Sequence, residues 1–206
     1  MSQGRQAAHT RRLIRRTLIE LVEEKGFADV SVADIAHRAM IDRSTFYRHY
    51  RDKDDLVEQI FNEIAGEPGA GGEAPGGGTP DRIGWWTEMF EHFGRHAELY
   101  RALLGPGGSP VFAARLRERC AQVARRRMRV MSGPEGAGEP GVPEDLVFVL
   151  AANLIVGTAA WWLDSPLRYT PGQMARAVVR LLGEHHFEVL GLGRELAVEG
   201  DLVGGD

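Results

Sequence analysis

The segment VSVADIAHRAMIDRSTFYRHYRDKDDLV, residues 30–57, decides the fold of the first part of this chain. It holds two short helical patterns, residues 32–39 and 43–50, separated by a three-residue break. Ser31 and Asp34 stand at the start of the first pattern with the spacing of a helix-capping pair. Two short helices joined by such a turn form a helix-turn-helix unit, whose second helix enters the major groove of DNA.

The residues on either side of this segment complete a small helical bundle. Residues 8–25 carry an apolar stripe at helical spacing and stop before Gly26, a residue that favours helix ends. Residues 53–65 carry a second apolar stripe behind an acidic start at Asp52. We expect the two stripes to close the bundle, so that the DNA-binding domain spans residues 1–65.

The second helix of the pair has a polar outer face. Phe46 and Tyr50 lie four residues apart and are expected to pack inward. The outward side chains form hydrogen bonds, which suits base edges and phosphates, and none of them is acidic: Arg43, Ser44, Thr45, Tyr47, Arg48 and His49. This composition favours a DNA-reading helix over a purely structural one.

The charge of the chain is unevenly distributed. The net charge is −4, which alone argues against a nucleic-acid binder. Residues 1–51 nevertheless contain ten Lys and Arg against six Asp and Glu. A basic end and an acidic body indicate that the first part of the chain faces a polyanion.

The ordered combination of these features resembles the DNA-binding signature of the TetR family of one-component bacterial regulators, over about residues 10–62. The matching elements are a leading helix that ends in Gly-Phe, an Ile-Ala pair, the run Ser-Thr-Phe-Tyr-Arg-His-Tyr, and Lys-Asp-Asp-Leu at the start of the fourth helix. The family usually has glycine in the turn where this chain has Met40. We therefore expect a positive φ at Met40, at a cost of about 1 kcal/mol.

The resemblance implies roles for the matching positions. Tyr47 and Lys53 resemble phosphate contacts, and Ser31 with the amides of its helix start adds another. Arg43, Ser44, Thr45 and His49 resemble the residues that face the groove.

The rest of the chain is also expected to be helical. Strand patterns are absent, and helical patterns occupy residues 80–104, 110–131, 143–164 and 171–190. The fold class is therefore all-α, with the helix-turn-helix domain followed by a helical domain at residues 79–190. We expect a glycine-rich linker at residues 66–78 and a disordered tail at residues 191–206.

The resemblance implies that the C-terminal helices bind an effector and form a dimer. Helices 143–164 and 171–190 carry broad apolar faces that would form a four-helix bundle across a two-fold axis, unless both pack inside the monomer. An effector pocket for a small apolar or aromatic molecule is expected among large apolar residues and a few neighbours: Trp86, Met89, Phe90, Phe93, Tyr100, Leu104, Phe112, Leu116, Cys120, Asn153 and Trp161.

Enzyme motifs are absent from the sequence. It contains no Gly-x-Ser-x-Gly, no Walker loop and no His-Glu-x-x-His. His92 and His96 lie four apart, but no cysteine or acid pattern supports a metal site there. We expect no catalysis, cofactor or metal. With no secretion signal and no unbroken apolar span, we also expect a cytoplasmic protein with no membrane partner.

These features predict a ligand-responsive repressor that binds a palindromic DNA operator as a homodimer. The alternative is a helical adaptor that binds other proteins and has no effector response. Retardation of double-stranded DNA, weakening steeply with salt, distinguishes the regulator from the adaptor.

Overall fold

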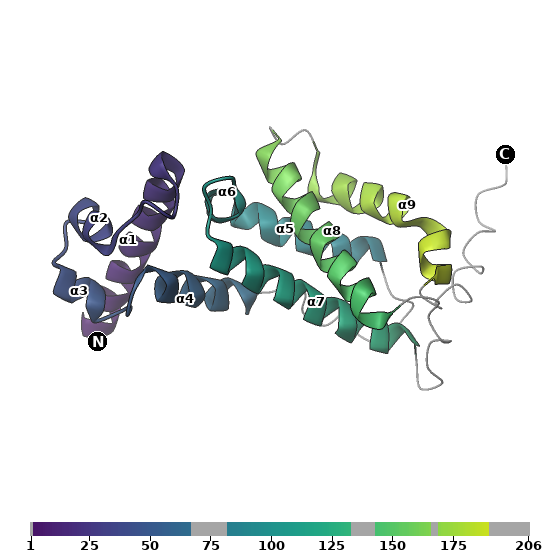
Figure 1. Cartoon of the computed structure of the whole chain (residues 1–206), viewed down its shortest axis with the longest axis horizontal. Helices are drawn as coiled ribbons and strands as arrows, with labels where there is room; N and C mark the ends of the chain where they lie inside the picture. Colours follow the sequence, from purple (N-terminus) through teal and green to yellow (C-terminus); the bar gives the residue numbers. More distant parts are fainter. Residues whose placement is uncertain (1, 67–81, 133–142, 166–168, 190–206) are drawn as a thin grey trace.

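The structure is a computed structural model that describes residues 2–66, 82–132, 143–165 and 169–189. Within these residues it contains nine helices and no strand. The molecule is elongated, with helices α1 to α3 gathered at one end, α5 to α9 forming the larger body, and α4 running between them (Figure 1). The all-α fold with an N-terminal helix-turn-helix domain and a C-terminal helical domain is therefore confirmed.

The N-terminal domain consists of four helices: α1 Ser2–Lys25, α2 Val32–Arg38, α3 Arg43–Tyr47 and α4 Lys53–Ala65. Its core is formed by apolar side chains at helical spacing: Ile14, Leu18, Leu21, Val22, Phe27, Val30, Ile35, Phe46, Tyr50, Leu56, Val57 and Ile60. The predicted end of the third helix at Tyr50 is wrong, because α3 ends at Tyr47. Beyond Tyr47 the chain tightens into a turn in which the His49 amide donates to the Phe46 carbonyl, three residues back, at 2.9 Å.

The turn between α2 and α3 has the expected left-handed residue. Met40 has φ of 50°, and its side chain is 93% exposed. The Ile41 amide donates to the Ala36 oxygen at 3.0 Å and the Met40 amide donates to the His37 oxygen at 3.1 Å. These two bonds form a Schellman motif, which satisfies the last carbonyls of α2. The turn is therefore complete without glycine, at the cost of a left-handed methionine.

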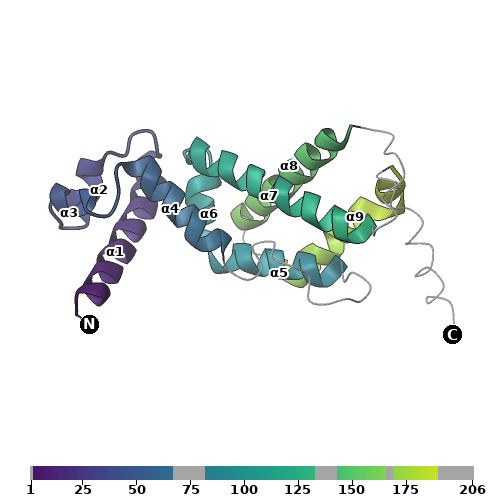
Figure 2. The same ribbon diagram turned by 90° about the horizontal axis from the view of Figure 1, so that it is seen from below.

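The C-terminal domain consists of five helices: α5 Arg82–Arg95, α6 Ala97–Leu104, α7 Pro110–Ser132, α8 Glu144–Asp164 and α9 Pro171–Val189. Helix α7 packs along α8, and α5 packs along α9 (Figure 2). The single helix predicted at residues 80–104 is wrong. His96, with φ of −114° and ψ of 29°, breaks it and starts α6 in a new direction. The break lets Leu99, Tyr100 and Leu103 of α6 be buried.

The domains contact each other in several places, including the packing of α4 on α7 and the approach of Phe27 to Gly107. Along α4 and α7, the Arg115 guanidinium lies 3.1 Å from the Glu58 carboxylate. At the second of these places, the Phe27 amide donates to the Gly107 carbonyl at 2.7 Å. A Cβ atom at Gly107 would lie 3.1 Å from the Gly26 Cα, so this close approach favours glycine.

Several sequence predictions fall outside the described residues. These are nearly all of the glycine-rich linker at residues 66–78, the Pro80 helix start, and the tail at residues 191–206. Only Gly66 of the linker is described, and it caps the C-terminus of α4.

Candidate nucleic-acid interface and effector cavity

Helix α3 presents its polar face because Phe46 anchors its opposite face. The Phe46 side chain is completely buried, and its ring lies 5.6 Å from the Tyr50 ring and 5.7 Å from the Tyr47 ring. The Tyr47 side chain is 57% exposed and meets Phe46 edge-on. The buried Phe46 ring thus fixes the rotation of α3 about its own axis and leaves Tyr47 facing solvent.

The other predicted DNA contacts, on α3 and the turn that follows it, lie around Tyr47. Arg43, Ser44 and Arg48 are exposed, whereas Thr45 and His49 are half-buried. The Arg48 guanidinium donates to the Thr45 hydroxyl at 2.7 Å, so these two side chains are held together. The structure therefore brings the six predicted side chains onto one short segment. Their individual contacts with DNA stay predictions.

His49 is held in its neutral form. Partial burial lowers its pKa, and the positive charges of Arg11 and Arg48 lower it further. Because the ordinary pKa of histidine is about 6.5, the lowered value leaves an uncharged imidazole at neutral pH. An uncharged imidazole offers hydrogen-bonding atoms but no positive charge.

The predicted phosphate contact at Ser31 is built into a capping box. The Asp34 amide donates to the Ser31 hydroxyl oxygen at 3.2 Å, and the Ser31 amide donates to the Asp34 carboxylate at 2.8 Å. The Ser31 hydroxyl also donates to that carboxylate, and the Lys25 ammonium lies 2.9 Å from it. These partners hold the pKa of Asp34 well below its usual range. The Ser31 side chain thus fixes the start of α2.

Lys53 has an intramolecular role that the sequence did not reveal. Its ammonium donates to the carbonyl oxygens of Phe27 at 2.7 Å, Val30 at 2.9 Å and Ala28 at 3.1 Å. It also lies 4.5 Å from the centre of the Phe27 ring. Lys53 therefore ties the loop before α2 to the start of α4. The predicted phosphate contact of this residue stays a prediction.

Replacement of Lys53 by methionine is expected to lower the free energy of unfolding by about 2 kcal/mol, because three carbonyls lose a charged donor. Chemical denaturation of the full chain measures this loss. Lys25→Met is the matched control, since Lys25 is the only other lysine and forms an exposed ion pair worth about 0–1 kcal/mol. Equal stability of the two variants would contradict the role assigned to Lys53.

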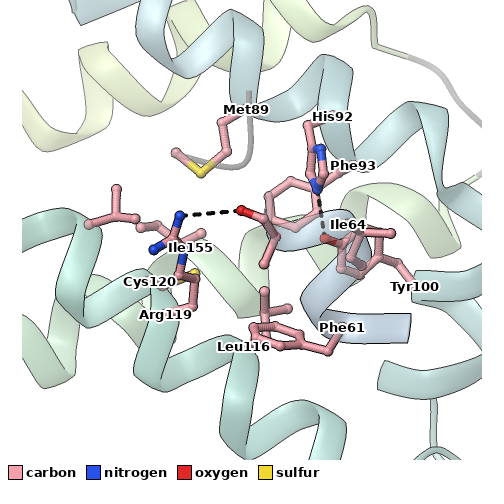
Figure 3. A pocket seen from close by; sticks show the side chains of 12 residues that line it. Phe61, Ile64, Met89, His92, Phe93, Tyr100, Leu116, Arg119, Cys120 and Ile155 are labelled. Atoms are coloured by element: carbon pink, nitrogen blue, oxygen red, sulfur yellow. Dashed lines mark hydrogen bonds between the residues drawn. The ribbon is translucent and has the colours of Figure 1, made fainter. Parts of the chain in front are cut away.

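A small cavity lies between α4 and the C-terminal helices. Its volume is about 20 Å³, room for roughly one water molecule. Twelve residues line it, from α4, α5, α6, α7 and α8 (Figure 3): Phe61, Ile64, Ala65, Met89, His92, Phe93, Tyr100, Leu116, Arg119, Cys120, Val123 and Ile155. The walls are therefore mainly apolar, with a few polar groups.

The cavity brings together some of the predicted pocket residues and leaves others out. Five of them line it: Met89, Phe93, Tyr100, Leu116 and Cys120. Four more lie outside this lining: Phe90 and Phe112 are fully buried, whereas Trp86 and Leu104 are partly buried. The remaining two, Asn153 and Trp161, are exposed on α8, so they do not line the cavity.

The sequence did not predict that α4 and the polar residues His92 and Arg119 line the cavity. Phe61 and Ile64 were assigned to the DNA-binding domain, and only the packing of α4 on α7 brings them to the cavity. Local periodicity carries no signal for such a contact between distant segments. The sequence predicts no metal site at His92 and assigns it no other partner, whereas its Nε2 lies 2.9 Å from the Tyr100 hydroxyl.

Cys120 is not a reactive thiol in this setting. Burial raises its pKa to about 12, and the positive charge of Arg119 only partly opposes that rise. The thiolate is the reactive form of cysteine, so this side chain acts as a packing group.

A polar groove lies outside the cavity, between α4 and α7. Its volume is about 350 Å³, and charged and amide side chains line much of it: Glu58, Asn62, Arg115, Glu118, Arg119 and Gln122. Phe61, Ala65 and Arg119 border both the groove and the inner cavity. These three residues separate the apolar interior from the solvent-filled groove.

Helix α8 is apolar on two faces. Among the described residues it is the one helix whose length and composition would allow it to cross a membrane. One face packs into the core through residues such as Phe148, Ile155 and Trp162. The other face is exposed, and we call it the α8 face: Leu146, Val149, Leu150, Leu154 and Trp161.

Comparison with known proteins identifies the N-terminal domain. Residues 14–60 match the sequence family described as bacterial regulatory proteins, tetR family. The HTH-type transcriptional regulator YxbF of Bacillus subtilis is 28% identical over 64 residues, which are 31% of this chain and 17% of that protein. The chain therefore matches only a small part of the length of this curated relative.

The solved structures resemble the whole chain. A TetR transcriptional regulator from Streptococcus agalactiae has a TM-score of 0.65 at 22% identity, over 88% of this chain and 98% of that one. NalD, the secondary repressor of a multidrug efflux pump in Pseudomonas aeruginosa, has a TM-score of 0.61 at 24% identity, over 89% and 97%. At these identities the likeness establishes the fold. The match over residues 14–60 shows that the N-terminal domain is similar to the DNA-binding part of bacterial regulatory proteins of the tetR family, and the solved structures show that the whole chain shares the fold of such regulators.

Proposed function

We propose that the chain is a cytoplasmic, ligand-responsive repressor that binds a palindromic operator as a homodimer. The observation that carries this proposal is the polar face of α3, held outward by the buried Phe46. Each protomer would insert one copy of α3 into the major groove. Two-fold symmetry would place the copies about 34–36 Å apart, one turn of DNA.

The α8 face supports the dimer. A contiguous row of exposed apolar side chains is rare on a monomer and usual at an interface. The space around Gly157 is open, since a Cβ atom there would meet nothing within 4 Å. On α9, the Leu181 side chain is exposed as well. A second copy of the chain would cover these surfaces and form a four-helix bundle.

Helix α4 would transmit the effector signal. Its first residue, Lys53, holds the loop that precedes α2. Its last turns supply Phe61, Ile64 and Ala65 to the cavity. A ligand that widened the cavity would shift α4 against α7 and change the separation of the two α3 helices. The protein would then have two conformations, before and after the shift of α4. The binding free energy for DNA would weaken by at most the difference between the ligand's binding free energies for these two conformations.

The Tyr47→Phe variant tests the DNA interface. Loss of one phosphate hydrogen bond per protomer is expected to lower operator affinity on the order of tenfold, equally for all sequences. The salt dependence should stay the same, because tyrosine carries no charge to neutralise a phosphate. Gel retardation over a range of salt concentrations measures both quantities.

Tyr169→Phe is the control, because it makes the same change at an exposed tyrosine between α8 and α9. A change of base preference in Tyr47→Phe would contradict the phosphate assignment. A wild-type protein that retards no double-stranded DNA would overturn the proposal and leave the adaptor alternative.

A further inference from the structure

Arg119 stands between the apolar cavity and the polar groove. It lies on α7 and borders both spaces. The other cavity-lining residues are apolar except for His92 and Tyr100, which are hydrogen-bonded to each other. Arg119 is therefore a cation in the wall of an otherwise largely apolar cavity (Figure 3), at the boundary with the groove.

Carboxylates neutralise the charge of Arg115, one turn earlier on α7, but not the charge of Arg119. The Arg115 guanidinium lies 3.1 Å from the Glu58 carboxylate and 3.4 Å from the Glu118 carboxylate. Across the described residues, no carboxylate lies within ion-pairing distance of Arg119. Its one hydrogen bond there is a long one, from Nη2 to the Ala65 carbonyl at 3.3 Å.

The Nε atom of Arg119 is buried and has no hydrogen-bond partner in the described part of the chain. A buried donor without a partner is unfavourable, and more so when it is charged. Guanidinium groups satisfy two donors at once with a carboxylate, through two parallel hydrogen bonds. A carboxylate at Arg119 would therefore satisfy the buried Nε donor and a neighbouring Nη donor together.

We propose that the effector is an organic monocarboxylate with an apolar body. This inference rests on the proposed ligand response and assigns the class of ligand. The carboxylate pairs with Arg119, and the apolar body enters the space between Met89, Phe93 and Leu116. One negative charge fits better than two, because Glu58 and Glu118 line the groove through which the ligand enters.

Binding at this position acts directly on α4. The groove already holds about 350 Å³, but the inner cavity holds only about 20 Å³. The apolar body therefore has to displace Phe61, and the carboxylate has to replace the Ala65 carbonyl at Arg119. Both groups belong to α4, so ligand entry separates α4 from α7. The ligand class and the movement of the DNA-binding domain follow from the same contact.

The experiment compares three series of probes with the full-length protein. Saturated carboxylates from hexanoate to dodecanoate are matched with the alcohols and the amines of the same chain lengths, below their micelle-forming concentrations. Calorimetry measures binding, and gel retardation measures release of DNA. We expect the carboxylates to bind most tightly. Tighter binding of the alcohols or amines, or no binding by any series, would overturn the proposal.

Variants locate the charge contact. Arg119→Gln should weaken carboxylate binding by about ten- to hundredfold and leave the weak binding of the alcohols nearly unchanged. Arg119→Lys should recover part of the lost carboxylate affinity, because lysine restores the positive charge but not the two parallel donors of the planar guanidinium. Arg117→Gln is the matched control, since Arg117 is exposed on the same helix and borders neither space. Equal weakening by Arg117→Gln would contradict a specific contact at Arg119.

The two readouts separate this inference from the proposed function. Release of DNA by alcohols but not by carboxylates would overturn the ligand class and preserve the ligand response. Carboxylate binding that requires Arg119 but releases no DNA would confirm the site and contradict the ligand response.

Discussion

Replacement of Leu150 by aspartate is expected to convert the proposed dimer into a monomer at micromolar concentration. Leu150 lies near the middle of the α8 face and its side chain is 56% exposed. A two-fold axis would bring both new carboxylates into one apolar interface, at a cost of several kcal/mol. The dissociation constant of the dimer should rise on the order of a thousandfold or more, since each 1.4 kcal/mol is a factor of ten. Size-exclusion chromatography with light scattering measures the mass.

The control for this variant is Val111→Asp, which places the same charge at an exposed apolar position on α7. It should leave the dimer intact. Because Leu150 is exposed within the protomer, its replacement should preserve the helical content of the chain. A dimeric Leu150→Asp protein would contradict the assignment of the α8 face as the interface. Loss of tight operator binding together with the dimer would support two-fold reading of DNA.

Replacement of Phe46 by alanine is expected to lower the free energy of unfolding by about 3–5 kcal/mol, as for other fully buried phenylalanines. Phe46 has no exposed surface and contacts the rings of Tyr47 and Tyr50. The cavity left behind would also free α3 to rotate, so DNA binding should be lost. Urea unfolding followed by circular dichroism measures the stability.

Tyr47→Ala is the matched control, because it removes the adjacent aromatic side chain from the exposed side of the same helix. It should cost well under half of the stability lost in Phe46→Ala, since surface changes are usually within about 0.5 kcal/mol. DNA binding should nevertheless fall in both variants. Similar stability losses would contradict the division of α3 into an anchoring face and a reading face.

The features of the DNA-binding domain that could be predicted are local ones. The capping pair Ser31 and Asp34 and the helix end at Gly26 each depend on residues within a few positions, whereas the left-handed turn at Met40 was expected from the resemblance to the TetR family. The inward positions of Phe46 and Tyr50 follow from helical spacing. Short-range rules therefore describe this part of the chain well.

The features that could not be predicted depend on distant contacts. Lys53 binds carbonyls more than twenty residues earlier, and its sequence position gives no sign of them. No proline marks the break at His96, and the helical spacing of apolar residues continues across it, so the sequence predicts a single helix there. The cavity combines α4 with four helices of the other domain, which no local pattern encodes. Apolar spacing cannot distinguish a wall of this cavity, such as Leu116, from core packing, such as Phe112.

Selection of binding sites by the full-length protein from a random library of double-stranded DNA tests whether a dimer reads DNA through α3. We expect enrichment of an inverted repeat whose half-site centres are about 34–36 Å apart, one copy for each α3 helix. The Phe46→Ala protein should enrich no sequence. Enrichment of a single unrepeated site, or of no site by the wild-type protein, would contradict a dimeric regulator that reads DNA through α3.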